Sequence, residues 1–589
     1  MDFARGSITQ ANKYLRRYEP LEIVLQTLFA IVSVFLTIRA FNALSGGFQV
    51  KTFVFKFVTS LPYLREIKKK KLQEAKKDIF KTVHGKLCKL GYRTCLPSMS
   101  SSVSEVLKVA SSYHSSSAVS WKDGRMSGAV YPSNSGLNEL LIESKILVGL
   151  DAISNPGLGE AMKQEDRVIS FGVLKLLSLL YNKFYPLVKI QKMTLWSNPL
   201  HVDAFPAVRR MEAEVVRMCL TMFNGDSESC GTMTSGGTES IMLACLAYRN
   251  RAYKLGIKEP EVVIPISAHA AFDKAGSMMN IRVKKVPLDP KTFKVDLRAM
   301  KRAITRRTCM LVGSAPQYPQ GIIDDIKSIA KLGALRGIPV HVDCCLGGFL
   351  VPFMEEAGFP LDLFDFRLPG VTSISCDTHK YGFAAKGSSV IMYRNRALRA
   401  NQFFLLPDWS GGIYASPTFA GSRSGALIAA CWSALMYFGR EGYVNSTKRI
   451  ISTARTIAKG VSSIPGLRVL GEPQVSVVAF TSDAFDIYQL AELMSHHPDG
   501  SANWSLSVLQ YPPAVHLCVT DLHTQPGVAQ LFLDDLKVAA ERLLNSPKSE
   551  STGTAAIYGM CAQIPDRSLV ASVVASFLDA CYATEGPDD

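Results

Sequence analysis

The chain has 589 residues, of which 47% are hydrophobic and 20% are charged, so it is a folded protein that is long enough for more than one domain. Its 13 cysteines are dilute and show no metal-ligand spacing, which excludes a disulfide scaffold or a zinc module as the organising feature, and we expect no metal site. The formal net charge of +16 indicates an acidic partner, and basic residues beside a membrane segment explain it better than nucleic-acid binding does.

The N-terminal region contains one candidate transmembrane helix. The residues from Ile23 to Ile38 carry no charge and the apolar stretch continues to Leu44, so we expect a single span over residues 21–44 after a lumenal segment of residues 1–20. A buried core helix is the alternative, and a cleaved signal peptide fits less well because a polar segment precedes the span. More Lys and Arg residues follow the span than precede it, so the positive-inside rule predicts a cytosolic body.

Residues 45–130 are predicted to form a juxtamembrane and linker segment. They include the basic run Lys68–Lys71 and the serine-rich stretch Pro97–Ser120, and both compositions are typical of solvated connecting chain. From about residue 198, short β-branched runs such as Val262–Ile264 alternate with helical stretches such as Met211–Leu220. This alternation predicts βαβ units and a mostly parallel sheet.

A loop rich in glycine and hydroxyl groups, Thr234–Ser240, leads into the apolar helical run Ile241–Ala247. Its glycines free the backbone amides, its hydroxyls donate, and the helix N-terminus adds its dipole, so the loop favours an anion such as a phosphate. The lysine of a Walker loop is absent. For any one of these residues a plain helix cap is the alternative.

Three chemically suggestive residues follow predicted strands. His269 could stack on a flat cofactor or be a core histidine, and Asp343 ends an apolar strand, where its carboxylate either meets a cation such as a protonated pyridine nitrogen or caps a helix. Lys380 lies beside Asp377 and His379. Partial desolvation would lower the pKa of its amine and favour imine formation, although most lysines are surface charges. Together the phosphate loop, histidine, aspartate and lysine, in this order, predict pyridoxal 5'-phosphate as the cofactor.

With these motifs the chain closely resembles the sphingosine-1-phosphate lyases, within the fold-type-I group of pyridoxal-phosphate enzymes related to glutamate decarboxylase. The stretches that carry the resemblance are Trp121–Tyr131, Asn198–His201, Gly231–Ser240, His341–Gly348, Val371–Ser389, Trp409–Tyr414, Gly421–Arg423, Ile557–Met560 and Ile564–Arg567. The resemblance implies an α/β fold with a mostly parallel sheet in a large cofactor-binding domain over residues 131–420. It also implies a smaller C-terminal α/β domain over residues 421–589.

The resemblance also implies a role for each matching residue. Lys380 would form the imine with the cofactor, Asp343 would pair with the pyridine nitrogen, and His269 would stack on the ring. The cofactor phosphate would be held by Ser235, Gly236, Gly237, Thr238 and His379. The other catalytic residues would be Tyr131, His201 and Tyr318, and the substrate phosphate would be bound by Lys386, Tyr131 and His201.

The function implied by the resemblance is cleavage of the C2–C3 bond of a phosphorylated sphingoid base to a fatty aldehyde and phosphoethanolamine. The enzyme would be a homodimer, anchored by one span in the endoplasmic reticulum membrane, with its catalytic part cytosolic and with no nucleic-acid partner. Two alternatives remain: an amino-acid decarboxylase, which uses the same cofactor apparatus, and a catalytically silent membrane-anchored homologue.

The chain departs from the family pattern in one long stretch and at single positions. Residues from about 145 to 192 form an insertion, which is either a translated intron or a lineage-specific segment. It separates Tyr131 from His201 in sequence and could displace both from the substrate. Cys344 stands where family members commonly have alanine, and Ser424 where they have proline. Neither single change removes a group that the mechanism needs.

Overall fold

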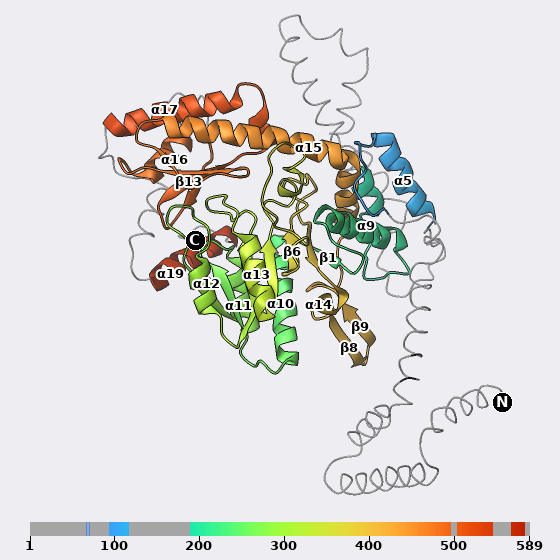
Figure 1. The fold of residues 1–589 in the computed structure, drawn as a ribbon. Helices are drawn as coiled ribbons and strands as arrows, with labels where there is room; N and C mark the ends of the chain where they lie inside the picture. The colour runs from blue at the N-terminus through green and yellow to red at the C-terminus, as the bar shows by residue number, and fades with distance from the viewer. Residues whose placement is uncertain are drawn as a thin grey trace, which may run out of the picture. The chain divides into compact units, whose positions relative to one another are not determined.

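The computed structural model describes residues 66, 70, 93–116, 189–495, 504–545 and 567–582 (Figure 1). The predicted span over residues 21–44, Tyr131 and nearly all of the insertion lie outside the described residues. Within the described ranges, no helix combines the length and the apolar character that crossing a membrane requires.

A central sheet of seven strands forms the core of the fold. Its strands lie in the order β1-β7-β6-β5-β4-β2-β3, with bounds β1 Cys230–Thr234, β2 Glu261–Pro265, β3 Arg282–Val286, β4 Thr308–Ser314, β5 Val340–Asp343, β6 Val371–Cys376 and β7 Ser389–Tyr393. Strand β7 is antiparallel to both of its neighbours, and the other pairings are parallel. The predicted mostly parallel sheet is therefore confirmed.

Helices cover both faces of this sheet, because alternate strand residues enter two different apolar clusters. Val262 and Ile264 pack with residues of α10 (Gly237–Lys254) and α11 (Ala271–Met279). Val263, between them, packs in the cluster that holds the opposite helices. The helices of that second face are α9 Pro206–Met222, α12 Leu297–Ala303, α13 Ile326–Arg336 and α15 Gly425–Ser463.

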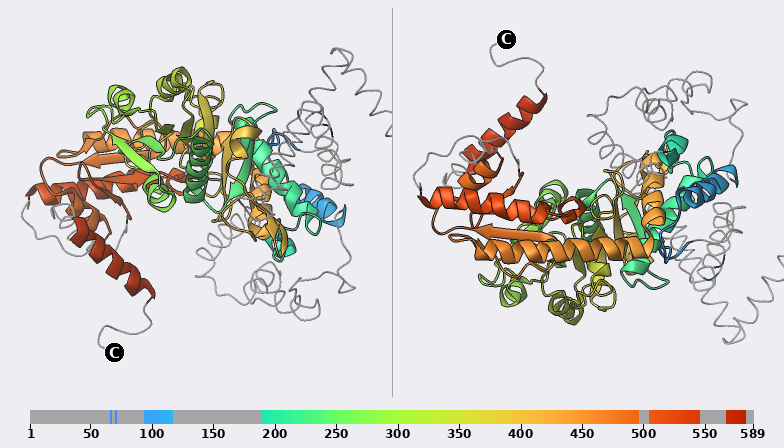
Figure 2. Two further views of the ribbon diagram at one scale, coloured as in Figure 1. Left: turned by 90° about the horizontal axis from the view of Figure 1, so that it is seen from below. Right: turned by 90° about the horizontal axis from the view of Figure 1, so that it is seen from above.

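A smaller antiparallel sheet follows. Its strand order is β10-β11-β13-β12, with bounds β10 Arg468–Val469, β11 Val477–Thr481, β12 Ser507–Leu509 and β13 Ala514–Cys518, beside α16 Ile487–Ser495 and α17 Val528–Asn545. A last described helix is α19 Arg567–Tyr582. Helix α15 packs on both α9 and α17, and Figures 1 and 2 show it in orange along the body. It therefore links the large sheet to the small one.

Part of the predicted linker is in fact a helix, α5 (Val103–Ser116), so the linker interpretation is wrong for these residues. Its start carries a capping box, because the Ser102 amide donates to Glu105 Oε2 (2.8 Å) and the Glu105 amide donates to Ser102 Oγ (3.3 Å). Val106, Ala110 and Tyr113 recur at helical spacing and are buried. The serine-rich composition hides this apolar stripe.

Glu214 is fully buried (0% exposed) and joins α5, α9 and α15. Its carboxylate accepts hydrogen bonds from Arg210 Nε (3.0 Å), the Tyr113 hydroxyl (3.1 Å) and Trp432 Nε1 (2.7 Å). The Arg210 guanidinium also lies over the Tyr113 ring, 4.2 Å from its centroid. The buried charge is thus paired and hydrogen-bonded on several sides, as burial of a carboxylate requires.

Candidate active site

The residues predicted to hold the cofactor lie on loops at one edge of the central sheet. Strands β1, β2, β4, β5 and β6 run in the same direction, so their carboxyl ends meet at that edge, where ligands of open α/β sheets bind. Ser235, His269, Tyr318 and Lys380 follow β1, β2, β4 and β6, and Asp343 is the last residue of β5. The sequence-predicted set is therefore brought to one edge by the topology.

Lys380 forms an ion pair with Asp377, with Nζ 2.9 Å from Oδ2. Burial by itself lowers the pKa of this amine, but Asp377, Cys345 and Asp343 together outweigh burial and hold the pKa of Lys380 above its ordinary value. The prediction of a lowered lysine pKa is therefore wrong here. Because a neutral amine is needed to attack an aldehyde, Asp377, at 2.9 Å, is also within reach to accept the proton that Lys380 must lose.

The phosphate loop packs directly on the turn that carries Lys380. A side chain at Gly237 would bring its Cβ to 2.8 Å from both Asp377 carboxyl oxygens and from Cys345 Sγ. A Cβ at Gly236 would lie 3.4 Å from His379 Cε1. Burial lowers the pKa of His379, whose Nδ1 accepts the Ser388 amide at 3.1 Å. The glycines thus allow the loop amides to approach His379 and Asp377.

Gly237→Ala is expected to weaken cofactor binding about tenfold or more, because the added methyl group must displace Asp377 or Cys345 and overpacking of this kind costs about 1–3 kcal/mol. Titration of the protein with pyridoxal phosphate, followed by absorbance, measures the change. Gly256→Ala is the control for backbone strain without a clash. Its φ is positive, which disfavours alanine, but its added Cβ would meet nothing within 4 Å. Wild-type affinity in Gly237→Ala would contradict the expectation.

Ser235 is held by a carboxylate in this structure. Its amide and its hydroxyl donate to Glu239 Oε2 at 2.6 and 2.8 Å, while Glu239 Oε1 accepts the Phe419 amide at 3.3 Å. A phosphate could use the Ser235 donors only after Glu239 releases them, because two anions repel each other at one donor group. The sequence analysis did not identify Glu239, although the loop motif contains it.

Asp343 has the environment that a cationic ring nitrogen needs. It is buried, and its Oδ1 accepts from the Cys345 amide (3.1 Å) and from the Ser375 hydroxyl (3.1 Å). Its Oδ2 has no hydrogen-bond partner in the part of the chain that the structure describes. Asp343 is 7% exposed, and a carboxylate so far removed from water favours a cationic partner, so the site fits pyridoxal phosphate, whose protonated ring nitrogen would donate to Oδ2.

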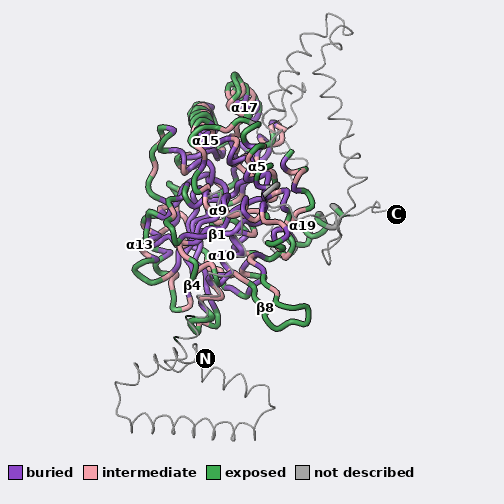
Figure 3. The backbone as a smooth tube through the Cα atoms, turned by 90° about the vertical axis from the view of Figure 1, so that its right-hand side faces the viewer, coloured by how far each residue is buried: buried purple, intermediate pink, exposed green. Residues whose placement is uncertain are grey.

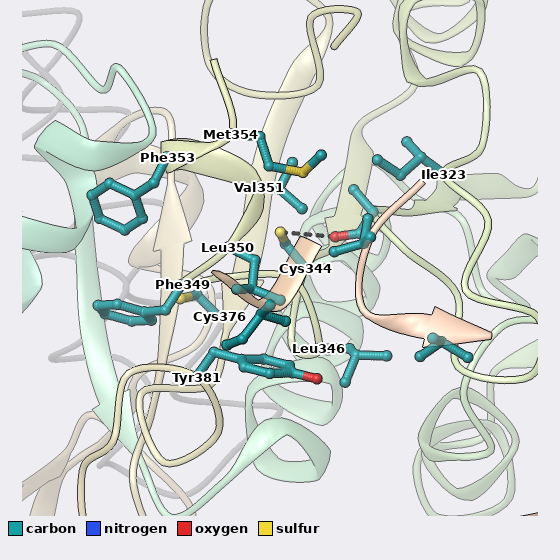
Figure 4. Packing of buried hydrophobic residues seen from close by; sticks show 14 of the residues in the cluster. Ile323, Cys344, Leu346, Phe349, Leu350, Val351, Phe353, Met354, Cys376 and Tyr381 are labelled. Carbon is teal, nitrogen blue, oxygen red and sulfur yellow. Dashed lines mark hydrogen bonds between the residues drawn. The ribbon is translucent and has the colours of Figure 1, made fainter. Parts of the chain in front are cut away.

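The residue that differs from the family pattern next to Asp343 is accommodated. Cys344 is fully buried, and its thiol donates to the Ala315 carbonyl at 3.0 Å (Figure 4). Figure 4 shows it in the same apolar cluster as Phe349, Leu350 and Tyr381. The buried thiol therefore does not leave an unsatisfied donor.

His269 and Tyr318 lie at the rim of this site. His269 is exposed, and its Nδ1 accepts the Ala271 amide at 3.1 Å, which orients the ring. Tyr318 is 46% exposed and packs edge-to-face on His516 of β13, with ring centroids 4.8 Å apart. Among the described residues, neither forms a hydrogen bond to Lys380 or Asp343.

Asp324 follows the loop that carries Tyr318, and it is expected to make the free energy of unfolding depend on pH. Burial raises the pKa of its carboxyl to about 6, against the effect of the Ser314 and Val295 amides that donate to it. The unfolded value is about 4, so its contribution to stability is full below about pH 4 and is lost as the pH rises through about 6. The stability of wild type minus that of Asp324→Asn should fall by about 3 kcal/mol over this range. Urea unfolding of both proteins from pH 4 to 7 measures it, and a constant difference would refute the expectation.

A cavity of about 520 Å³ adjoins the phosphate loop. Its lining includes Ser235, Thr238 and Gly387, together with residues 419, 420 and 422–424. Lys386, next to this lining, is exposed and donates to the His379 carbonyl at 3.3 Å. The predicted substrate-phosphate lysine therefore lies beside the phosphate loop.

The turn that carries His201 is tied to the far wall of this cavity by Asn198. Asn198 donates to Ser422 Oγ (3.0 Å) and accepts the Arg423 amide (3.2 Å). The Asn198 carbonyl also accepts the His201 amide (3.1 Å). Arg423 pairs in turn with Glu212. Sequence reasoning singled out the stretches around Asn198 and Ser422 but assigned these two residues no role.

Comparison with known proteins gives a consistent result. Residues 192–483 match the family described as pyridoxal-dependent decarboxylase conserved domain. The chain is 44% identical over 576 residues to sphingosine-1-phosphate lyase 1 of Rattus norvegicus, covering 98% of this chain and 92% of that protein. It is 44% identical over 532 residues to sphingosine-1-phosphate lyase of Drosophila melanogaster, covering 90% and 88%.

Solved structures show the same similarity. The sphingosine-1-phosphate lyase of Burkholderia pseudomallei has a TM-score of 0.63 at 37% sequence identity, covering 72% of this chain and 97% of that chain. Glutamate decarboxylase of Lactobacillus brevis, at 22% identity and a TM-score of 0.54, covers 62% of this chain and 86% of that chain. The second similarity concerns the fold alone.

Proposed function

Because this chain belongs to the sphingosine-1-phosphate lyase family, we propose that it cleaves phosphorylated sphingoid bases at the C2–C3 bond to give a fatty aldehyde and phosphoethanolamine. The observation that carries the proposal is the set formed by Lys380, the buried carboxylate Asp343 and the glycine-rich loop at one sheet edge. Pyridoxal phosphate is the cofactor that this family uses and that the site fits.

Each of these residues has a distinct task in holding the cofactor. Lys380 would supply the amine that bonds to its aldehyde carbon, Asp343 Oδ2 would accept the ring-nitrogen proton, and His269 would cover one face of the ring. The amides of Gly236 and Gly237, at the start of α10, would bind its phosphate together with Ser235, Thr238 and His379. When bound, the cofactor draws off the electron pair that remains at C2 after the C2–C3 bond breaks.

The remaining work is proton transfer and recognition of the substrate phosphate. A base must remove the proton of the C3 hydroxyl, and an acid must return a proton to C2. The candidates are Tyr131, His201, Tyr318 and Lys380. The exposed Lys386 would bind the substrate phosphate as a point charge, together with Tyr131 and His201.

Incubation of the purified protein and pyridoxal phosphate with a phosphorylated long-chain base tests the proposal. We expect equal amounts of fatty aldehyde and phosphoethanolamine. Release of carbon dioxide from an amino acid without any aldehyde would identify a decarboxylase. If neither aldehyde nor carbon dioxide forms, the protein is a silent homologue.

We infer a homodimer from an exposed apolar hairpin, β8 Phe404–Trp409 and β9 Gly412–Ser416. Every residue of β8 is exposed (Figure 3), and Trp409 and Ile413 are 54% and 85% exposed. Such a patch is typical of an interaction surface. The chain runs on from β9 into residues 419, 420 and 422–424, which line the cavity beside the phosphate loop, so a second copy seated on the hairpin would also border the site.

Ile413→Asp is expected to shift the protein from dimer to monomer and to lower aldehyde release, because a charge would be buried in the apolar interface. Sedimentation velocity measures the mass, and activity is measured at the same concentrations. Leu335→Asp on α13, at a residue 74% exposed, is the matched control. If the Ile413→Asp variant stays a fully active dimer, the hairpin is not part of the dimer interface.

The membrane anchor is proposed from the apolar stretch over residues 21–44. A long-chain substrate resides in the bilayer, so an anchor that keeps the catalytic part at the cytosolic face of the endoplasmic reticulum shortens its path. The full chain should stay in the membrane pellet after alkaline extraction, and release into the supernatant would contradict the anchor.

A further inference from the structure

Behind Asp343, three buried side chains form a hydrogen-bonded chain that leads away from the cofactor site. The Ser375 hydroxyl donates to Asp343 Oδ1 at 3.1 Å. His341 Nε2 lies 3.2 Å from Ser375 Oγ, and His341 Nδ1 lies 2.8 Å from Ser373 Oγ. His341, Ser373 and Ser375 are each 0% exposed, so water does not compete for these bonds.

Strand pairing places the four side chains on one face of the sheet. Within β5, His341 and Asp343 are two residues apart, and within β6 the same is true of Ser373 and Ser375, so each pair shares a face. The parallel register sets His341 against Ser373 and Asp343 against Ser375. On the outer side Phe272 of α11 packs edge-on against the His341 ring, with centroids 6.0 Å apart. The chain is therefore held by backbone geometry and packing.

The hydrogen bonds point in one direction, toward Asp343. Ser375 has one hydroxyl proton and donates it to Asp343, so its oxygen must accept from His341 Nε2–H. Nδ1 of the same ring then has no proton and accepts the hydroxyl of Ser373. Burial lowers the pKa of His341 to about 4, and the charged group that opposes this is Asp343. The ring is thus neutral at pH 7 with its single proton on Nε2.

We propose that Ser375 and His341 are positioning residues that fix the orientation of the Asp343 carboxylate, with Oδ2 aimed at the cofactor ring nitrogen. This inference rests on the proposed cofactor role of Asp343. The hydrogen bonds donated to Oδ1 restrict rotation of the carboxylate, and a chain of aligned donors strengthens each bond in it. With Oδ1 occupied by Ser375 and the Cys345 amide, Oδ2 is the oxygen left to bind the cofactor.

The test compares Ser375→Ala with Ser375→Thr, which keeps the hydroxyl. Ser375→Ala should weaken pyridoxal phosphate binding about tenfold, because hydrogen bonds to charged groups are the strong ones. The pH at which the bound cofactor changes its visible absorbance should also rise. A pyridine ring that is less fully protonated withdraws fewer electrons from the imine with Lys380, so the imine keeps its proton to a higher pH. Lys380 and Asp377 also face this region and are unchanged in every variant. Ser375→Thr should restore most of both properties.

Controls separate this role from a merely structural one. Ser433→Ala removes an equally buried hydroxyl from α15 and should leave both cofactor readouts at the wild-type value. The melting temperature of the cofactor-free proteins reports folding. If Ser375→Ala does not fold, Ser375→Val against Ser375→Thr gives the same comparison at equal side-chain volume.

Asp343→Asn distinguishes failure of this inference from failure of the proposed function. If Asp343→Asn impairs cofactor binding while Ser375→Ala and His341→Phe bind and titrate as wild type does, the positioning role is wrong and the cofactor role of Asp343 stands. If Asp343→Asn itself binds the cofactor normally, the assignment of Asp343 fails as well.

Discussion

Lys380→Ala is expected to abolish aldehyde release, with a loss of at least about 10³-fold. It removes the amine that bonds to the cofactor and also the partner of Asp377, 2.9 Å away. The variant should lose its cofactor on desalting, whereas wild type should retain it after reduction with borohydride. Absorbance of the desalted protein and an aldehyde assay measure the two effects.

Lys331→Ala, at an exposed position of α13, is the matched control and should behave as wild type. A Lys380→Ala protein that retains covalently bound cofactor would show that another lysine carries it. Normal aldehyde release from this variant would rule out the proposed mechanism altogether.

Glu214→Ala is expected to give the largest loss of stability, about 3–5 kcal/mol. The change removes the carboxylate that pairs with the buried Arg210 and accepts from the Trp432 indole and the Tyr113 hydroxyl. The helices α5, α9 and α15 would lose their common polar contact. Urea unfolding followed by tryptophan fluorescence measures the effect, since Trp432 reports on the site itself.

Two further variants sharpen the result. Tyr113→Phe removes one donor only and should cost about 1 kcal/mol, and Glu541→Ala on the exposed face of α17 (53% exposed) should cost almost nothing. A loss below about 1 kcal/mol in Glu214→Ala would mean that water enters and replaces the carboxylate.

The predictions that the structure confirms depend on local pattern. The runs around Val262–Ile264 and Met211–Leu220 form β2 and α9, because period and branching are properties of neighbouring residues. The helix α5 was missed because its apolar residues are few, and their burial depends on α9 and α15. Its capping box, Ser102 with Glu105, was the local signal that could have identified it.

By itself, the sequence predicted the cofactor correctly, and the residue types, their order and their places after strands led to the proposed roles of Lys380, Asp343 and the glycine-rich loop. Tertiary structure decided how these groups are charged and joined. Asp377 raises the pKa of Lys380, and Glu239 accepts the hydrogen bond that the Ser235 amide donates. Asn198 donates a hydrogen bond to Ser422, more than two hundred residues later in the chain. The physical reason is that electrostatic and hydrogen-bond energies depend on distances of a few ångströms, and sequence separation does not determine such distances until strand order and packing bring the residues together.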